Sequence, residues 1–286
     1  MRLRRAATIL GAAVLCGSCV RIAGDAEFSV GVIAGELRGA NLDEASGLVA
    51  SQRHPGHYWV HNDSGNDPEL VLVDSTGAAQ MTLRIEGVRN RDWEDIARLG
   101  DTILVAEIGD NRAEHDTIFV IALREPATRA DTAVRPLGVY PMRFPDGARD
   151  AETLLADPLT GDWFIISKRE DRVRVYRYAA PQRAGVLHTL ERIPGELGMR
   201  MVVGGDVSPD GSELLVKTYD AVYHWRRHGQ ESLRVTLMRP PRRQPYTPEK
   251  QGEAIGFWLD GGGYVTTSEA EADLPQLFIR YARRPR

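Results

Sequence analysis

The sequence predicts an all-β fold, a β-propeller of five four-stranded blades. Three observations predict it: an acidic residue that opens an apolar strand recurs about every 50 residues, short strands separated by turns follow each acid, and one lone strand precedes the first acid. Units that must stack on neighbours to bury their faces are typical of repeat folds. The five acids are Glu44, Glu94, Glu152, Asp206 and Glu253.

Each unit reads as an inner strand directly after the acid, a turn, and two or three further strands. Turn residues separate these strands, as in the Ser-Pro-Asp-Gly stretch at 208–211. We expect the last strands of the third and fourth units at 186–188 and 233–236, and irregular connections at 124–134 and 240–251. We expect no helix, because no segment shows a convincing helical period of apolar residues.

The fifth unit ends one strand short of the others. The segment 28–33 reads as a strand and would supply the missing one, so that the beginning of the domain closes its last blade. Six blades remain the alternative, although the sequence offers no sixth unit opened by an acid. The prediction is therefore one closed domain.

The first residues read as an export signal, with a basic stretch at 1–5 and an apolar stretch at 6–15 that is too short to span a bilayer comfortably. The small residues before Cys19 resemble a bacterial lipobox, which predicts lipidation of Cys19. Ordinary cleavage, for example after Ala26, is the alternative. We expect an exported protein of the cell envelope, or a secreted or periplasmic one. Its expected parts are a leader at 1–19, a linker at 20–27 and one propeller domain at 28–286.

Composition argues against several classes of protein. Lys and Arg number 36 against 40 Asp and Glu, a net charge of −4, whereas a nucleic-acid binder should show a basic excess or stripe. Both cysteines lie in the leader, so the domain has no disulfide or thiol site. No later stretch is apolar enough to span a membrane, which leaves the lipid anchor as the expected membrane contact. The 7 histidines are not clustered, which argues against zinc. We expect a monomer.

The five acids should meet at one mouth of the central channel, because the first strand of each blade lines the channel. Like charges in a partly dry site raise one another's pKa until some take up protons. A Ca²⁺ ion, which accepts six to eight oxygen ligands, would neutralise the ring; alternatively, Lys168 and Lys217 would neutralise part of it. As a further alternative, the carboxylates accept backbone N–H groups of neighbouring blades and fix the blade spacing.

The ends of the second strands return to the same mouth, since these strands run antiparallel to the first, and they are unusually polar. Asp63 and Asp110 are the candidates to orient a catalytic water. His61, beside Asp63, is a weaker candidate for a general base, because the sequence offers no paired nucleophile. The residues expected to bind a small anionic ligand or an envelope partner are His61, Asn111, Lys168, Arg169, Lys217, Tyr219 and Glu269.

Several motifs carry a resemblance to a known family. They include Glu-Ala-Ser-Gly at 44–47, Asp-Trp-Glu-Asp-Ile at 92–96, Ile-Gly-Asp-Asn at 108–111 and Gly-Glu-Ala-Ile at 252–255. Together they resemble a family of uncharacterised bacterial exported β-propeller proteins, described as WD40-like or as related to esterase-like phytases. The resemblance covers nearly the whole chain after about residue 41. It implies a propeller and brings no established reaction.

The repeat is also similar, more distantly, to the calcium-activated nucleotidases (apyrases). Those proteins are five-bladed propellers with one Ca²⁺ on the axis, held by Ser and Glu residues of the blade-opening strands. The resemblance implies a set of calcium ligands at matching positions of this chain. That set is Ser46, Glu94, Glu152, Ser208 and Glu253, with Glu44 and Asp206 as extra acids.

Two functions follow as hypotheses. The first is a calcium-stabilised envelope propeller that binds a ligand or a partner at its acidic mouth. The alternative is a calcium-dependent phosphoester hydrolase of the phytase or nucleotidase kind, in which the cation polarises a phosphate. In the hydrolase, Lys168, Arg169 and Lys217 would hold the phosphate charge, and Asp63 or Asp110 would orient water. A purely structural propeller, whose acids bond only to backbone, is the third hypothesis.

Overall fold

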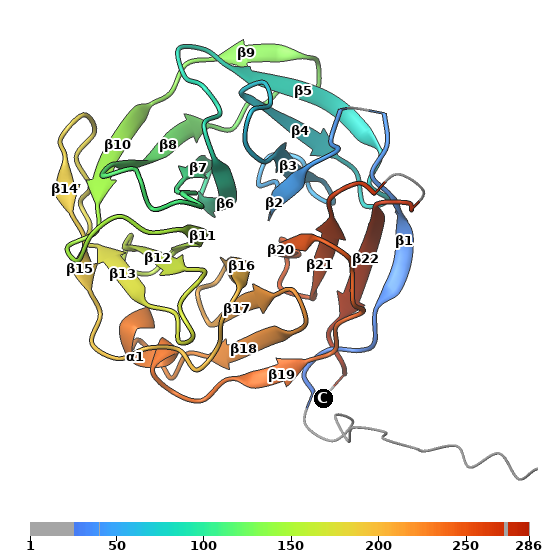
Figure 1. Cartoon of the computed structure of the whole chain (residues 1–286). Helices are drawn as coiled ribbons and strands as arrows, with labels where there is room; N and C mark the ends of the chain where they lie inside the picture. The colour runs from blue at the N-terminus through green and yellow to red at the C-terminus, as the bar shows by residue number, and fades with distance from the viewer. Residues whose placement is uncertain (1–25, 40, 272–273, 286) are drawn as a thin grey trace, which may run out of the picture.

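The computed structural model describes residues 26–39, 41–271 and 274–285 of the chain. In these residues five β-sheets stand as blades around a central axis, as Figure 1 shows in a view along that axis. The prediction of an all-β propeller with five blades is confirmed. The leader, and Cys19 with it, lies outside the described residues.

The innermost strand of each blade is the strand that the acids predicted. Four of the five are buried at every residue, and each contacts the innermost strands of the neighbouring blades, which closes the ring. The five strands are β2 (Ala45–Ala50), β6 (Trp93–Leu99), β11 (Ala151–Ala156), β16 (Val202–Val207) and β20 (Gly252–Phe257).

The other strands of each blade follow outward in antiparallel order. The second and third strands are β3 (Tyr58–Asn62) and β4 (Glu69–Val73), β7 (Thr102–Glu107) and β8 (Ile118–Arg124), β12 (Trp163–Ser167) and β13 (Val175–Tyr178), β17 (Glu213–Thr218) and β18 (Val222–Arg226), and β21 (Gly263–Ser268) and β22 (Leu277–Ala282). The fourth strands are β5 (Ala79–Ile85), β10 (Gly138–Arg143), β15 (Glu191–Arg192), β19 (Arg242–Gln244) and β1 (Val32–Glu36).

Two outer strands differ from the prediction. The segment expected as the fourth strand of the fourth blade forms the short helix α1 (Leu233–Leu237), in which Leu233, Thr236 and Leu237 are buried at helical spacing. The actual fourth strand, β19, lies in the stretch expected to be irregular. In the third blade the fourth strand is β15, and His188 belongs instead to β14 (His188–Thr189).

Two short strands join neighbouring blades. β14 pairs in parallel with β10 of the second blade, although it lies between two strands of the third. In the same way β9 (Thr132–Val134), from the expected irregular stretch at 124–134, pairs in parallel with β5 of the first blade. These pairings cover the outer edges of two blades, which would otherwise expose unpaired backbone groups.

The apolar core lies between the blades. Each of five clusters of buried side chains draws on two neighbouring blades. Trp59 of the first blade and Trp93 of the second, for example, share one cluster and are fully buried. Burial of each large apolar side chain contributes about 1.5–3 kcal/mol, so the blades stabilise one another rather than folding as independent sheets.

Segments from both ends of the domain close the ring. β1 pairs antiparallel with β22, which confirms that an N-terminal strand completes the last blade. Before it, Phe28 bridges to Arg283 and packs edge-on against Tyr264. The Arg283 guanidinium donates to both oxygens of Glu213 in the fourth blade, at 3.2 and 2.6 Å. The same carboxylate lies 3.3 Å from Nε2 of His224.

No helix in the described part of the chain is long and apolar enough to cross a bilayer.

We predict that Glu213→Gln destabilises the domain by about 2 kcal/mol, because it leaves Arg283 without its anionic partner. Burial opposes ionisation of Glu213, but the contacts of His224 and Arg283 outweigh it and lower the pKa to about 2. A lowered folded-state pKa stabilises the fold above the unfolded value of about 4.3, and that contribution is lost as the pH falls toward 2. Urea unfolding at pH 7 and at pH 3 measures both effects.

Glu86→Gln is the matched control, since the pair of Glu86 with Arg135 is largely exposed. It should cost no more than about 0.5 kcal/mol. Equal losses for the two variants, or a Glu213→Gln loss that does not shrink at pH 3, would contradict the proposed role of Glu213 in ring closure.

Candidate metal centre

A β-bulge recurs near the start of the innermost strand in all five blades. In four blades the pairing of the first strand with the second skips one residue of the first strand, and in the fifth it skips two residues of the first strand opposite one of the second. A bulge of this kind bends the strand and re-aims a side chain. In four blades the extra residue is Ser46, Glu94, Glu152 or Val203, and in the fifth the skipped stretch contains Glu253.

The bulges bring three glutamates from three blades together at one mouth of the channel. Glu94, Glu152 and Glu253 each place a carboxylate oxygen within 4.8 Å of the oxygens of the other two. All three residues are buried, with 2%, 3% and 4% of their surfaces exposed. We call these three residues the glutamate triad.

The triad has few donors. The Lys168 ammonium, from the loop after β12, donates to Glu152 Oε1 and lies 4.0 Å from Glu253. The Tyr219 hydroxyl donates to Glu253 Oε1 at 2.6 Å. No described residue donates to the Glu94 carboxylate, and the second oxygen of Glu152 is buried without a partner. Among the described residues, Lys168 is therefore the only cation that forms an ion pair with any of the three carboxylates.

Burial and this crowding raise the pKa values of two of the triad carboxylates. Burial raises the pKa of Glu94 well above its usual range, and the charges of Glu152, Asp63 and Asp92 raise it further. Burial and Glu253 raise the pKa of Glu152, although Lys168 opposes them. Without a further cation, Glu94 and Glu152 therefore keep their protons to a higher pH than exposed glutamates do. A bound cation would displace these protons, because metal ligands must be deprotonated.

A second acidic group adjoins the triad and shares Glu94 with it. Asp63, Asp92 and Glu94 also hold carboxylate oxygens within 4.8 Å of one another. The Asp63 carboxylate accepts from the Ser64 backbone N–H and from no other described group. Burial, followed by the charges of Asp92 and Glu253, raises the pKa of Asp63 to about 7 despite that hydrogen bond. We call these residues the aspartate group.

The contacts of Gly109 explain why the Ile-Gly-Asp-Asn motif has a glycine at this position. Its N–H donates to the Asp92 carbonyl at 3.2 Å. A Cβ on Gly109 would overlap Glu94 Oε1 and would lie 2.6 Å from Asp92 Oδ2. The backbone at Gly109 therefore lies in close contact with the Glu94 and Asp92 carboxylates. Only glycine at this position leaves room for both.

Asp206 does not belong to the mouth, which corrects the alignment of the five acids. It is the fifth of six residues in β16, and the bulge position of that strand is Val203. Its carboxylate accepts from the backbone N–H groups of Val207 and Phe257, both at 2.8 Å. Asp206 thus ties β16 to β20, which is the structural role that the sequence left open for the acids.

Asp95 plays the same structural part and was not singled out as a site residue. Its carboxylate accepts from Ile96 N at 2.9 Å and from Leu154 N of the next blade at 2.8 Å. Asp92 was also missed as a member of the acidic group. The signal was present, because both residues flank Glu94 in the motif at 92–96.

Three other residues expected as calcium ligands lie apart from the triad carboxylates. Ser46 occupies the bulge position of β2, but its hydroxyl donates to the Glu94 carbonyl at 2.8 Å. Glu44 is exposed and accepts from Asn66 at 2.5 Å. Ser208 follows the far end of β16, where its hydroxyl bonds Asp210 at 2.6 Å, so the expectation that it shares the mouth is wrong.

Asp110 and its neighbours organise a loop at the rim. The Asp110 carboxylate accepts from the N–H groups of Glu114 at 2.9 Å and His115 at 2.7 Å, which occupies both oxygens. Arg169 donates to Asn111 and pairs with the buried Asp150 at 2.6 Å. Arg169 and Asn111 remain accessible, whereas the carboxylate of Asp110 is committed to backbone.

Two of the other expected ligand-binding residues are closed off. Lys217 is fully buried, donates to the Gly252 carbonyl and lies 4.8 Å from the centre of the Tyr246 ring. Burial lowers its pKa to about 8. His61 is also fully buried, and its ring packs edge-on against Trp93. Burial lowers the pKa of His61 to about 4, so its imidazole is neutral at pH 7.

Glu269 and Tyr219, by contrast, lie beside the triad. Burial and the Glu253 charge raise the pKa of Glu269. The Tyr219 ring centre lies 5.4 Å from Nζ of Lys168. The structure therefore brings Lys168, Tyr219 and Glu269 together with the acids of the mouth, whereas Lys217 is buried against the Gly252 carbonyl and His61 is buried against Trp93.

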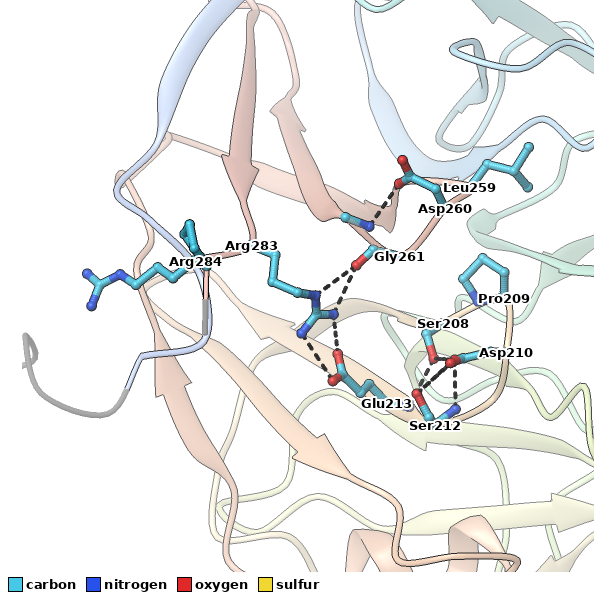
Figure 2. A pocket seen from close by; sticks show the side chains of 12 residues that line it. Ser208, Pro209, Asp210, Ser212, Glu213, Leu259, Asp260, Gly261, Arg283 and Arg284 are labelled. Carbon is cyan, nitrogen blue, oxygen red and sulfur yellow. Dashed lines mark hydrogen bonds and ion pairs between the residues drawn. The ribbon is translucent and has the colours of Figure 1, made fainter.

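A basin of about 710 Å³ lies away from the mouth, between the fourth and fifth blades (Figure 2). Its polar groups bond to one another: Arg283 bonds Glu213 and the Gly261 carbonyl, and Asp210 bonds Ser208 and Ser212. The basin therefore offers a ligand no unsatisfied charged group among these residues. The mouth is the better candidate site, because it contains carboxylate oxygens that accept no hydrogen bond from the described residues.

No protein-family model matches this chain, and no curated protein matches it. Among solved structures, a luciferin-regenerating enzyme is similar over 87% of this chain and 92% of its own, at 10% sequence identity and a TM-score of 0.45. The name of that protein describes its own activity. A likeness this distant assigns no residue of the mouth, and the five-bladed architecture rests on the sheets described above.

We predict that Gly109→Ala disturbs the candidate metal centre more than it disturbs the fold, because its methyl group displaces the Glu94 and Asp92 carboxylates. Calcium affinity should fall at least about tenfold, equivalent to about 1.4 kcal/mol. Calorimetric titration with calcium measures it. Gly198→Ala is the control, since a Cβ there meets only Arg172 at 3.5 Å. Equal affinities for both variants would contradict the role given to Gly109.

Proposed function

We propose that this chain is an exported, lipid-anchored propeller of the bacterial cell envelope that holds calcium at its acidic mouth and there binds an anionic ligand or a partner. One observation carries the proposal. Glu94, a residue with 2% of its surface exposed, lies beside two other buried glutamates, and its carboxylate has no hydrogen-bond donor in the described part of the chain. An undonated buried carboxylate is costly, and a cation is the partner that removes that cost.

The residues present fit a hard cation. Ca²⁺ binds carboxylate oxygens at 2.3–2.6 Å, so two oxygens on one ion lie no more than about 5 Å apart. The triad oxygens meet that limit, since they lie within 4.8 Å of one another. All the donor atoms are oxygens, which suits calcium better than zinc. Glu94, Glu152 and Glu253 would hold the ion, and the ion would supply a positive charge for an anion entering from solvent.

Lys168 by itself compensates the charge of the triad less well than a bound cation would. Its ammonium contacts Glu152 and approaches Glu253, and its pKa is raised because Glu152 more than offsets the effect of burial. The lysine is therefore charged, but it carries one positive charge against three carboxylates. It leaves Glu94 without any direct partner, and this favours an additional cation over the lysine by itself.

Anchoring is the part of the proposal that rests on sequence. The basic and apolar leader and the lipobox-like residues before Cys19 support it. The intact mass of protein recovered from a membrane fraction tests it. A chain that begins at a diacylated Cys19 agrees with the anchor, and an unmodified chain that begins after Ala26 would rule the anchor out.

We predict that calcium stabilises the wild-type domain and that Glu94→Gln removes most of that gain. Calcium at about 100 times its dissociation constant should raise the free energy of unfolding by about 2.7 kcal/mol. The calcium-free variant should be at least as stable as calcium-free wild type, because it loses a like charge from the triad. Thermal melting in calcium and in chelator measures both changes.

Glu44→Gln is the matched control for that experiment, because Glu44 is acidic but exposed. Its calcium-dependent gain should equal that of wild type. A full calcium response in Glu94→Gln would show that the triad is not the calcium site.

A calcium-dependent phosphoester hydrolase is the second candidate function. Asp63 supports it, since its carboxylate is only half-buried, adjoins the triad and has a pKa raised to about 7. A base whose pKa lies near the working pH is suited to take a proton from water. Lys168, which pairs with Glu152, and the exposed Arg169, which pairs with Asp150, are the cations that would hold a phosphate.

We predict, for this second function, that phosphate is released from phytate, nucleoside di- and triphosphates or aryl phosphates only when calcium is present. Asp63→Asn should lower kcat at least about 100-fold, as expected for loss of a general base. Activity should rise with pH as the raised carboxyl groups deprotonate. Asp67→Asn, an exposed change in the same loop, is the control. No phosphate release from any of these substrates would dismiss the hydrolase and leave the binding function standing.

A further inference from the structure

We propose that the mouth holds two divalent cations bridged by Glu94. The glutamate triad would hold the first, and the aspartate group, Asp63, Asp92 and Glu94, would hold the second. This inference rests on the proposed function, because it adds a second ion to the calcium site described there. It also changes the chemistry of the mouth, since a pair of cations can bind both oxygens of one anionic group.

The geometry of the two acidic groups supports a shared ligand. In each group the three carboxylate oxygens lie within 4.8 Å of one another, the spacing that one hard cation requires. Glu94 is the single residue common to both groups. A carboxylate has two oxygens and can give one to each ion. Bridged pairs of this kind in metal-dependent enzymes are about 3.5–4 Å apart.

The state of Glu94 is an independent sign of missing partners. Its side chain is buried between the two groups, yet no hydrogen bond or ion pair from a described residue reaches its carboxylate. Gly109 lies against it but donates its N–H to the Asp92 carbonyl. Buried carboxylates are normally paired or coordinate a metal. Two cations would partner both oxygens of Glu94.

The carboxylates of Asp63 and Asp92 form no ion pair with a described residue, although Arg91 lies near enough to oppose the effect of burial, which raises the pKa of Asp92. Lys168 faces Glu152 and Glu253 on the triad side. Arg91, next to Asp92 in sequence, points its guanidinium to the Thr117 carbonyl and lies 3.7 Å from Glu107. Arg169 is committed to Asp150. Within the described chain, no ion pair compensates Asp63 or Asp92.

The charge at the mouth distinguishes one cation from two. When all are ionised, the five carboxylates of the two groups carry five negative charges, and Lys168 offsets one of them. One divalent cation leaves two negative charges uncompensated in a partly dry site. Two divalent cations balance the remaining charge. The count of charges at the mouth therefore favours the pair over a single ion.

The test is the stoichiometry of calcium binding to the mature domain, measured by calorimetry and by elemental analysis after gel filtration. We expect two equivalents in wild type, one in Asp92→Asn and one in Asp63→Asn. Glu94→Gln should weaken both sites at least about tenfold, because it removes the shared ligand. Asp67→Asn should keep two equivalents. Circular dichroism and melting in chelator establish that each variant is folded.

Manganese provides a second readout that does not depend on the variants. Two Mn²⁺ ions bridged by one carboxylate couple magnetically, so the electron paramagnetic resonance spectrum of the loaded domain should differ from that of isolated Mn²⁺. One equivalent of calcium in wild type, unchanged by Asp92→Asn and Asp63→Asn, would overturn the second site and leave the triad site intact. Two uncoupled Mn²⁺ ions would overturn the Glu94 bridge. No calcium binding at all would overturn this inference together with the proposed function.

Discussion

The central constraint on this molecule is the crowding of carboxylates where five strands converge. Each innermost strand has a β-bulge near its start. Three of the bulged strands place a glutamate there, and carboxylate oxygens of these glutamates lie within 4.8 Å of one another. Crowded, buried carboxylates must be protonated, paired or bound to a cation. The single lysine at the mouth pairs with only part of the set. The rest of the propeller holds this arrangement in place.

The acids around the channel divide into two classes by their hydrogen bonds. Asp95 and Asp206 accept backbone N–H groups across blade boundaries, so their oxygens have hydrogen-bond partners in the fold and they fix the spacing of the inner strands. Glu94 has no such donors, and one oxygen of Glu152 has none. Residue type alone does not separate these classes. The difference is the register of each acid within its strand, which decides whether it meets backbone or other carboxylates.

The sequence predicted the blades better than it predicted the details of the mouth. Inner strands are recognisable because they are apolar and each follows a polar turn, whereas an outer strand of three polar residues such as β19, two of them exposed, has little pattern of its own. Leu233 lies three residues before Thr236 and four before Leu237, a spacing typical of the buried face of a helix. The repeat pattern nevertheless led us to expect a fourth strand there. Aligning on acidic residues misplaced Asp206, because loops of unequal length hide a shift of three residues from Val203. Lys217 is buried and lies against the ring of Tyr246, a contact that no local sequence pattern reveals.

Calcium content is the property that tests the account most directly. The mature domain, purified without added metal and then dialysed against calcium, should retain calcium in stoichiometric amount by elemental analysis. Its melting temperature should fall when a chelator removes the ion, because binding to the folded state alone stabilises it. A domain that retains no divalent cation and melts at the same temperature in calcium and in chelator would contradict the account. It would show that the triad is neutralised by protons and Lys168 alone.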